Sequence, residues 1–162
     1  MPEVTTYYLE MRSPSWLRSR KDPGGLQVYE CEIKAYQLNR FLYQYVGESW
    51  EWTDKLSWSD EQWKTYAVSD ALRTWLAHYR GSPAGYYELR QEGGDVEIAY
   101  FGLAPGFIGR GFGGYLLSHA IESAWAWKGT TRVWVHTCTL DHPSALPNYR
   151  ARGMKVFRTE TC

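Results

Sequence analysis

The sequence predicts a single mixed α/β domain, of the α+β kind, whose central sheet holds an antiparallel meander followed by a β-α-β unit. Three observations indicate this fold class. Strand-like and helix-like runs alternate along the chain, and three strand-like runs succeed one another between residues 71 and 103 with only short turns between them. No internal repeat or low-complexity linker divides the 162 residues. We therefore expect one domain over residues 1–162, long enough to bury a core.

The first half of the chain is predicted to contain two strands and two helices. Strands are expected at 4–12 and 26–32, and helices at 35–47 and 60–68. Gly47 stops the first helix. Ser59 and Gln62 have the spacing of a capping box, which marks the start of the second helix.

The second half is predicted to begin with the meander and to end with helices and strands in alternation. The expected strands are 71–80, 85–91, 95–103, 132–140 and 155–160, and the expected helices are 112–127 and 143–152. Short turns at "GSPA" and "EGG" join the first three of these strands, which indicates antiparallel pairing.

Composition limits the classes of partner. Lys plus Arg number 18 and Asp plus Glu also 18, so the net charge is zero, whereas a nucleic acid or an anionic membrane calls for a clustered positive field. We expect a small-molecule or peptide partner, and a homodimer is compatible with this composition. Cys31, Cys138 and Cys162 lie far apart without metal or disulfide spacing, which fits a reducing cytoplasm. Residues 1–30 show no leader pattern, and no run approaches the roughly 18 apolar residues of a membrane span.

The stretch "IGRGFGG" at residues 108–114 has the composition of a phosphate-binding loop. Gly109, Gly111 and Gly114 match G-x-G-x-x-G, a pattern of dinucleotide sites. A dinucleotide-binding loop follows the first strand of its domain, and an acidic residue comes about 20 positions after it. The loop at 108–114 instead lies late in the chain, and the residue 20 positions after Gly114 is Trp134. Glycine-rich backbone at a helix start still predicts an anion site, because several N–H groups point to one place beside the positive end of the helix dipole.

Two motifs resemble the GNAT N-acetyltransferase superfamily. The stretch "VEIAYFGLAPGFIGRGFGGYLL" resembles its acetyl-CoA loop, whose pattern is Gln or Arg, two residues, Gly, one residue, then Gly or Ala. Gly111 and Gly113 fall on the two small positions, and Ile108 falls on the Gln/Arg position, a departure that removes one side chain and leaves the backbone donors in place.

The second motif, "ALPNYRARGM", resembles the helix of that family that carries a tyrosine near a Gly-aromatic pair, with Tyr149, Gly153 and Met154 in those places. His142 stands where many members have Asn. The resemblance covers residues 95 to about 158, and residues 1–90 match only in outline.

The resemblance implies a GNAT-like fold and transfer of an acetyl group from acetyl-CoA to a primary amine, with no metal. The pantetheine arm is expected to enter a gap between splayed strands 95–103 and 132–140, with Gly102 as a β-bulge that opens it. The N–H of Leu103 would face the acetyl oxygen, and Arg110 could add a charge to the loop. The implied cofactor-binding residues are Phe101, Leu103, Gly109, Arg110, Gly111, Gly113, Gly114 and His142.

Glu97 and Tyr149 are the catalytic candidates. Glu97 lies six residues before Leu103, where some family members carry a glutamate that acts as base directly or through water; a solvated glutamate on a strand is an equal alternative. Tyr149 is the candidate acid toward the sulfur. Its alternative is a packed tyrosine.

Two other functions stay open. His136 and Cys138 share a strand face, so a thiol-based acyltransferase or hydrolase is conceivable, although a buried cysteine beside a hydrogen-bonded histidine is commoner. His136, Asp141 and His142 lack a recognised metal spacing. A GNAT-like module could also bind acyl-CoA or a metabolite as a sensor without turnover.

The acceptor is the least defined part. Residues 35–66 would line its side of the fold, and they combine aromatic rings with Glu48, Glu51 and Asp54. Rings with carboxylates suit a cationic amine, but an aromatic core with solvated acids has the same sequence. The candidate substrate residues are Tyr43, Trp50, Trp52 and Trp58.

Overall fold

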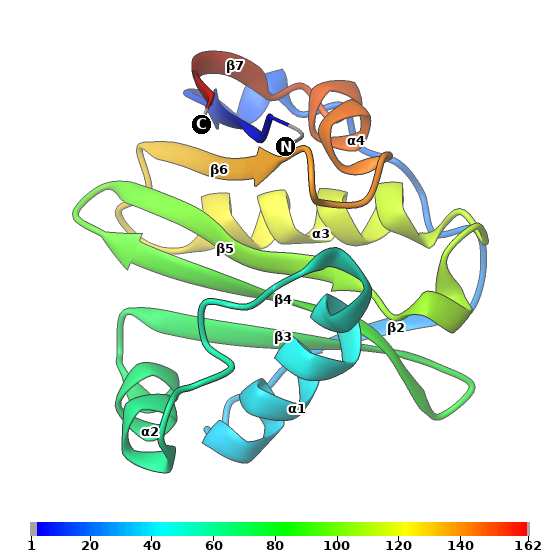
Figure 1. Ribbon diagram of the computed structural model, residues 1–162. Helices are drawn as coiled ribbons and strands as arrows, with labels where there is room; N and C mark the ends of the chain where they lie inside the picture. The colour runs from blue at the N-terminus through cyan, green and yellow to red at the C-terminus, as the bar shows by residue number, and fades with distance from the viewer. Residues whose placement is uncertain (1–2, 162) are drawn as a thin grey trace.

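The structure is a computed structural model that describes residues 3–161. Within these residues seven strands form one mixed sheet in the order β2-β3-β4-β5-β6-β1-β7, and helices cover both of its faces (Figure 1). The strands are β1 (Thr5–Met11), β2 (Leu26–Glu30), β3 (Leu72–Tyr79), β4 (Ser82–Glu92), β5 (Asp95–Leu103), β6 (Arg132–Cys138) and β7 (Lys155–Thr161). The α-helices are α1 (Tyr36–Gly47), α2 (Asp60–Val68), α3 (Phe112–Ala126) and α4 (Ala145–Ala151), with 3-10 turns η1 (Pro14–Trp16), η2 (Glu48–Trp50) and η3 (Pro105–Phe107).

These elements confirm the predicted α/β class and each strand and helix expected from the sequence, with ends that differ by at most three residues. The capping box of α2 is present, because Ser59 Oγ accepts the N–H of Gln62 and the Gln62 side chain accepts the N–H of Ser59. The antiparallel meander β3-β4-β5 is confirmed. The predicted turn at "GSPA" was misplaced: the turn is Arg80–Gly81, both with positive φ, and β4 begins at Ser82.

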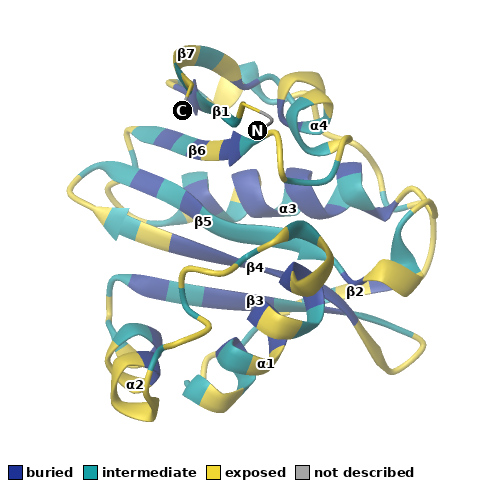
Figure 2. Ribbon diagram, viewed as in Figure 1, coloured by how far each residue is buried: buried dark blue, intermediate teal, exposed yellow. Residues whose placement is uncertain are grey.

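Each face of the sheet has its own apolar layer. The larger layer lies between the sheet and α3 and includes Leu9, Ile98, Leu116 and Ile121, all at most 2% exposed. On the other face α1 buries Leu42 and Val46 against Tyr86. Figure 2 shows buried residues along α3 and the central strands, while α2 and the turns are largely exposed. No helix of the described residues is both long and apolar enough to cross a bilayer.

The gap expected between β5 and β6 is present. The two strands pair in parallel only at Asp95–Glu97 with Arg132–Trp134, and they separate beyond that point. The bulge lies at Ala99 and not at the predicted Gly102, because Tyr100 pairs with Glu88 while Ile98 pairs with Leu89. One extra residue reverses the alternation of a strand. Glu97 and Tyr100 therefore share the α1 face, while Ile98 and Phe101 pack in the α3 layer.

Gly102 has a packing role instead. A Cβ atom at this position would lie 2.7 Å from Val46 Cγ1, closer than real contacts allow. The glycine therefore permits α1 to approach the strand end that borders the gap.

The first strand of the chain lies inside the sheet, where β1 pairs antiparallel with both β6 and β7. From β1 the chain crosses α4 and α3 before it reaches β2. The Arg18 N–H donates to the Arg152 carbonyl at 2.8 Å, and the Arg20 N–H donates to Ser118 Oγ at 2.8 Å. This connection brings residues 16–20 to the start of α3, a placement that the sequence did not predict.

Candidate active site

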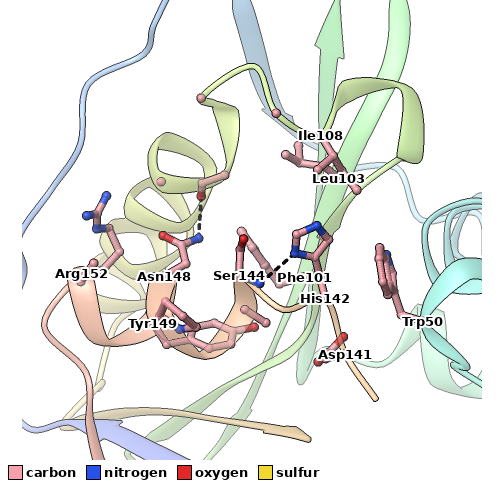
Figure 3. Close-up of a pocket in the computed structure, with 18 of the residues that line it drawn as sticks. Trp50, Phe101, Leu103, Ile108, Asp141, His142, Ser144, Asn148, Tyr149 and Arg152 are labelled. Carbon is pink, nitrogen blue, oxygen red and sulfur yellow. Dashed lines mark hydrogen bonds between the residues drawn. The ribbon is translucent and has the colours of Figure 1, made fainter. Parts of the chain in front are cut away.

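A cavity of about 420 Å³, here called the first cavity, lies between the end of β5, the start of α3 and α4. Figure 3 shows the side chains around it. Gly111 is the N-cap residue of α3 and has φ 84°, a left-handed conformation that favours glycine. The loop can therefore turn directly into the helix with its backbone against the cavity. Seven of the eight predicted cofactor-binding residues line it, namely Phe101, Leu103, Gly109, Gly111, Gly113, Gly114 and His142.

Arg110 is the exception. Its guanidinium lies over the ring of Tyr79, 5.6 Å from the centroid, and the residue does not line the first cavity. In this position the guanidinium group does not bring its charge to the first cavity, and cofactor binding through the Arg110 backbone N–H stays a prediction. Two other arginines, Arg20 and Arg152, line the first cavity instead.

Side chains of α4 and the segment before it tie the cavity together. The Asn148 amide Nδ2 donates to the Gly113 carbonyl at 3.1 Å, which joins α4 to the first turn of α3 (Figure 3). His142 accepts the Ser144 N–H on Nδ1 at 2.9 Å, and its ring meets Trp50 edge to face at 4.8 Å. The histidine thus has a fixed place in the wall of the cavity.

The backbone of Leu103 faces the gap. Successive N–H groups of a strand point to opposite edges, and the N–H of Ala104 donates to the Ala84 carbonyl on the β4 side at 2.8 Å. The Leu103 N–H therefore points to the other edge, where β6 has already separated from β5.

A second cavity of about 320 Å³ opens on the α1 face of the gap. Trp50, Trp52, Phe101, Asp141 and Tyr149 line both cavities, so these side chains form the wall where the two meet. The remaining ionisable groups around the second cavity are Glu51, Asp54, Lys55, Tyr66, Arg90, Glu97, Tyr100, His136 and Cys138.

Glu97 lines the second cavity opposite His136. Their Oε2 and Nε2 atoms are 3.7 Å apart, and the side chains are 21% and 51% exposed. Burial raises the pKa of Glu97, while electrostatic interactions with His136, Arg90 and Lys55 oppose that shift. A carboxylate with a raised pKa is a stronger base than an exposed glutamate, which suits proton abstraction.

Tyr149 stands where the two cavities meet. The residue is 5% exposed, and its ring lies 6.2 Å from that of Phe101. Burial, with the nearby Asp141, raises the pKa of the phenol, so Tyr149 keeps its proton at neutral pH. The Asp141 carboxylate is itself held by Thr137 Oγ1 at 2.7 Å and Trp52 Nε1 at 3.4 Å.

Lys55 lies among aromatic rings that include Trp58, one of the four residues expected to contact a cationic substrate. Its Nζ lies 4.4, 4.9 and 5.0 Å from the ring centroids of Trp58, Tyr66 and Tyr100 and donates to Tyr100 Oη at 3.1 Å. Burial lowers the pKa of this ammonium group. The negative charges of Asp54, Glu88 and Glu97 oppose this shift.

Two of the four predicted substrate residues do not reach either cavity. Tyr43 is 1% exposed in the core, where its hydroxyl accepts the Lys55 N–H at 3.1 Å. Trp58 packs on Trp63 and Tyr66 with centroid distances of 5.3 and 5.5 Å. These two rings are used in packing, whereas Trp50 and Trp52 line both cavities. Substrate contact by any of the four residues stays a prediction.

Four residues that line the cavities were not predicted from the sequence: Lys55, Asn148, Arg20 and Arg152. Asn148 and Arg152 could have been found, because positions i and i+4 share a helix face and both flank Tyr149 in the recognised motif. Arg20 and Lys55 lie in segments with no motif, and only the tertiary structure brings them to the cavities. His136 and Cys138 do line one cavity together, as their spacing predicted.

Comparison with known proteins places the chain in a family. Residues 33–154 match the acetyltransferase (GNAT) family, and the chain belongs to it. No curated protein matches the sequence.

Solved structures with the same fold are distant in sequence. A GCN5-related N-acetyltransferase from Kribbella flavida is 18% identical with a TM-score of 0.70, over 96% of this chain and 55% of that one. A second, from Sphaerobacter thermophilus, is 15% identical with a TM-score of 0.75, over 99% and 51%. An aminoglycoside acetyltransferase from an uncultured soil metagenomic sample is 17% identical with a TM-score of 0.61, over 78% and 86%. The chain thus spans about half the length of the first two.

Proposed function

We propose that the protein is an acetyl-CoA-dependent N-acetyltransferase that acetylates a primary amine of a small molecule or peptide by direct attack on the thioester. The observation that carries the proposal is the pair of cavities that meet at the gap between β5 and β6. One cavity is lined by glycine backbone at a helix start and the other by titratable side chains. Donor and acceptor would therefore approach the same point from opposite faces of the sheet.

The first cavity would hold acetyl-CoA. The backbone N–H groups of Gly109, Gly111 and Gly113 at the start of α3 are suited to the pyrophosphate. The pantetheine arm would lie in the gap, and the Leu103 N–H would stabilise the negative charge that develops on the acetyl oxygen.

The second cavity would hold the acceptor amine. Its volume of about 320 Å³ is at the small end of the range of ligand pockets, which favours a small amine or a peptide end. Glu97 would take a proton from the ammonium group, directly or through water, and Tyr149 would donate one to the departing CoA sulfur. These two groups face the second cavity and the junction of the cavities respectively.

A thiol-based mechanism is the second candidate, because Cys138, His136 and Glu97 line the same cavity. In that mechanism the Cys138 thiolate would attack the thioester carbon, CoA would leave as the thiolate, and the acceptor would then displace the cysteine. Mass spectrometry after mixing with acetyl-CoA alone distinguishes the two. A stable mass increase of one acetyl group on Cys138 would favour the thiol route.

The test of the proposed function is acetyl-CoA consumption, followed as free thiol, with a panel of amines that includes polyamines, amino-acid amides, peptides and aminoglycosides. We expect at least one amine to accelerate thiol release and to gain one acetyl group. Tight acetyl-CoA binding without turnover by any amine would favour the sensor alternative. The absence of any acetyl-CoA binding would refute both.

A further inference from the structure

Arg20 and Arg152 form a pair of guanidinium groups at the start of α3 for which the fold supplies no counter-charge. Both residues line the first cavity. A Cβ atom on Gly114 would lie 2.6 Å from Arg152 Nη1 and 2.7 Å from Arg20 Cδ, so the two side chains meet over this glycine. Among residues 3–161 neither has an ion pair within 4.0 Å.

Arg152 also has unsatisfied donors. Its Nε and Nη1 atoms are buried, and no hydrogen-bond acceptor contacts them in the part of the chain that the structure describes. Buried donors without partners are costly, and native proteins nearly always satisfy them. Two like charges placed side by side add to that cost. An anion on this side of the cavity would accept hydrogen bonds from the unpaired donors and offset the repulsion between the two guanidinium groups.

The structure holds both arginines firmly in place. The Arg20 N–H donates to Ser118 Oγ, which in turn donates to the Gly114 carbonyl, both at 2.8 Å. The Arg152 carbonyl accepts the Arg18 N–H at 2.8 Å. In Figure 3 Arg152, the C-cap residue of α4, lies beside Asn148, whose amide contacts the first turn of α3.

We propose that Arg152 and Arg20 bind the pyrophosphate of the acyl-CoA donor. They would replace the Gln or Arg side chain of the family's loop pattern, because Ile108 occupies that position here. The inference rests on the proposed function and extends it to the charged contacts. Ile108 cannot donate a hydrogen bond, and the Arg110 side chain is directed to Tyr79. Planar guanidinium groups bind phosphate oxygens with two parallel hydrogen bonds. Arg20 lies outside the matched residues 33–154.

The test compares three donors by calorimetry or ligand-induced thermal shift: acetyl-CoA, its 3′-dephospho form, and S-acetyl-pantetheine, which has no phosphate. Arg152→Gln and Arg20→Gln should weaken binding of the first two about tenfold to a hundredfold. Neither should change binding of the third. Arg150→Gln is the matched control, because Arg150 is exposed on the same helix and lines neither cavity.

Stability gives an independent readout. Without ligand, Arg152→Gln should unfold at an equal or higher temperature than the parent, because it removes a like charge and buried unpaired donors. If the variants lose affinity only for acetyl-CoA, the arginines bind the 3′-phosphate and not the pyrophosphate. If they lose affinity for all three donors, the role of the arginines is structural. Parent-like affinity in both variants would also overturn the proposal.

Failure of the proposed function is distinguishable from failure of this inference. If the parent binds no acetyl-CoA, inorganic pyrophosphate still tests the arginines by itself. Binding of pyrophosphate to the parent and to Arg150→Gln, lost in Arg152→Gln, would keep the anion site. Equal binding to all three proteins, or none to the parent, would refute it.

Discussion

The two cavities are built in different ways. The first is formed largely by two stretches, 101–114 and 141–152, in which glycines and short side chains leave backbone facing the cavity. The second collects side chains from two loops, two helices and three strands, and its ionisable groups include carboxylates, a histidine and a lysine. A cavity lined by backbone can be encoded by a local motif. A cavity lined by side chains from several elements is set by the tertiary arrangement and can differ between proteins of one fold.

The largest effect is expected from closing the first cavity, which the variant Gly113→Glu would do. A Cβ atom there makes only ordinary contacts, 3.7 Å from Asn148 and 3.9 Å from Leu103, and the backbone φ is not positive. The added bulk and negative charge should reduce acetyl-CoA affinity at least about 10³-fold, measured by calorimetry. The fold should survive, because an acidic residue suits the first turn of a helix.

Gly106→Glu is the control for this variant. A Cβ atom on Gly106 meets nothing within 4 Å, and the residue lines neither cavity. Gly111→Glu is less informative, since the φ of 84° at Gly111 would add backbone strain. If Gly113→Glu binds acetyl-CoA as the parent does, the donor does not occupy the first cavity.

The second cavity is tested by Glu97→Gln. If Glu97 is the base, the variant should lower the rate at pH 7 by roughly 10²-fold or more and recover partly as the pH rises, because more of the amine is then neutral without help. Burial raises the pKa of Glu97 above its ordinary value of 4.5, so the acidic limb of the parent profile should lie above pH 4.5. The measurement is kcat/KM against pH with the amine identified in the panel. An unchanged profile would return Glu97 to a structural role.

The junction of the cavities is tested by Tyr149→Phe. Removal of the hydroxyl keeps the ring that packs near Phe101, so stability and acetyl-CoA affinity should stay close to those of the parent. Turnover should fall by about 10²-fold, the scale for one general acid. Single-turnover rates measure the chemical step, and thermal unfolding measures stability, so a loss of catalysis can be told from a loss of the fold. Parent-like turnover would show that the thiolate leaves without help from Tyr149.

The contrast between the cavities also explains which features of the structure could be predicted from the sequence. Periodicity located the strands and helices, and the glycine spacing located the first cavity, because both depend on neighbouring residues. The sequence predicted the β-bulge at Gly102, but the structure has it at Ala99. A glycine in a strand marks either a bulge or a close approach of another element. At Gly102 the cause is the close approach of Val46. The pattern alone does not distinguish these two causes.

The second cavity was harder to predict for a related reason. Tyr43 and Trp58 have the residue types of a substrate pocket but are used in packing. Lys55 looked like one more surface lysine, and only the fold brings it among three rings. Composition can indicate an aromatic site, but it does not say whether a side chain of the same protein already fills it.

The smallest expected effect concerns that lysine. The positive charge of Lys55 lowers the pKa of Glu97 and so opposes the effect of burial. In Lys55→Met this charge is lost while an apolar side chain of similar length remains among the rings. The pKa of Glu97 should then rise further, so the carboxylate takes up its proton at a higher pH. If Glu97 is the base, the acidic limb of kcat/KM should move upward by less than about one pH unit, since the interaction is partly screened by solvent. Lys64→Met, an exposed position on α2, serves as the control. A limb that stays in place, or moves to lower pH, would mean that Lys55 and the group controlling the limb are not coupled as the structure indicates.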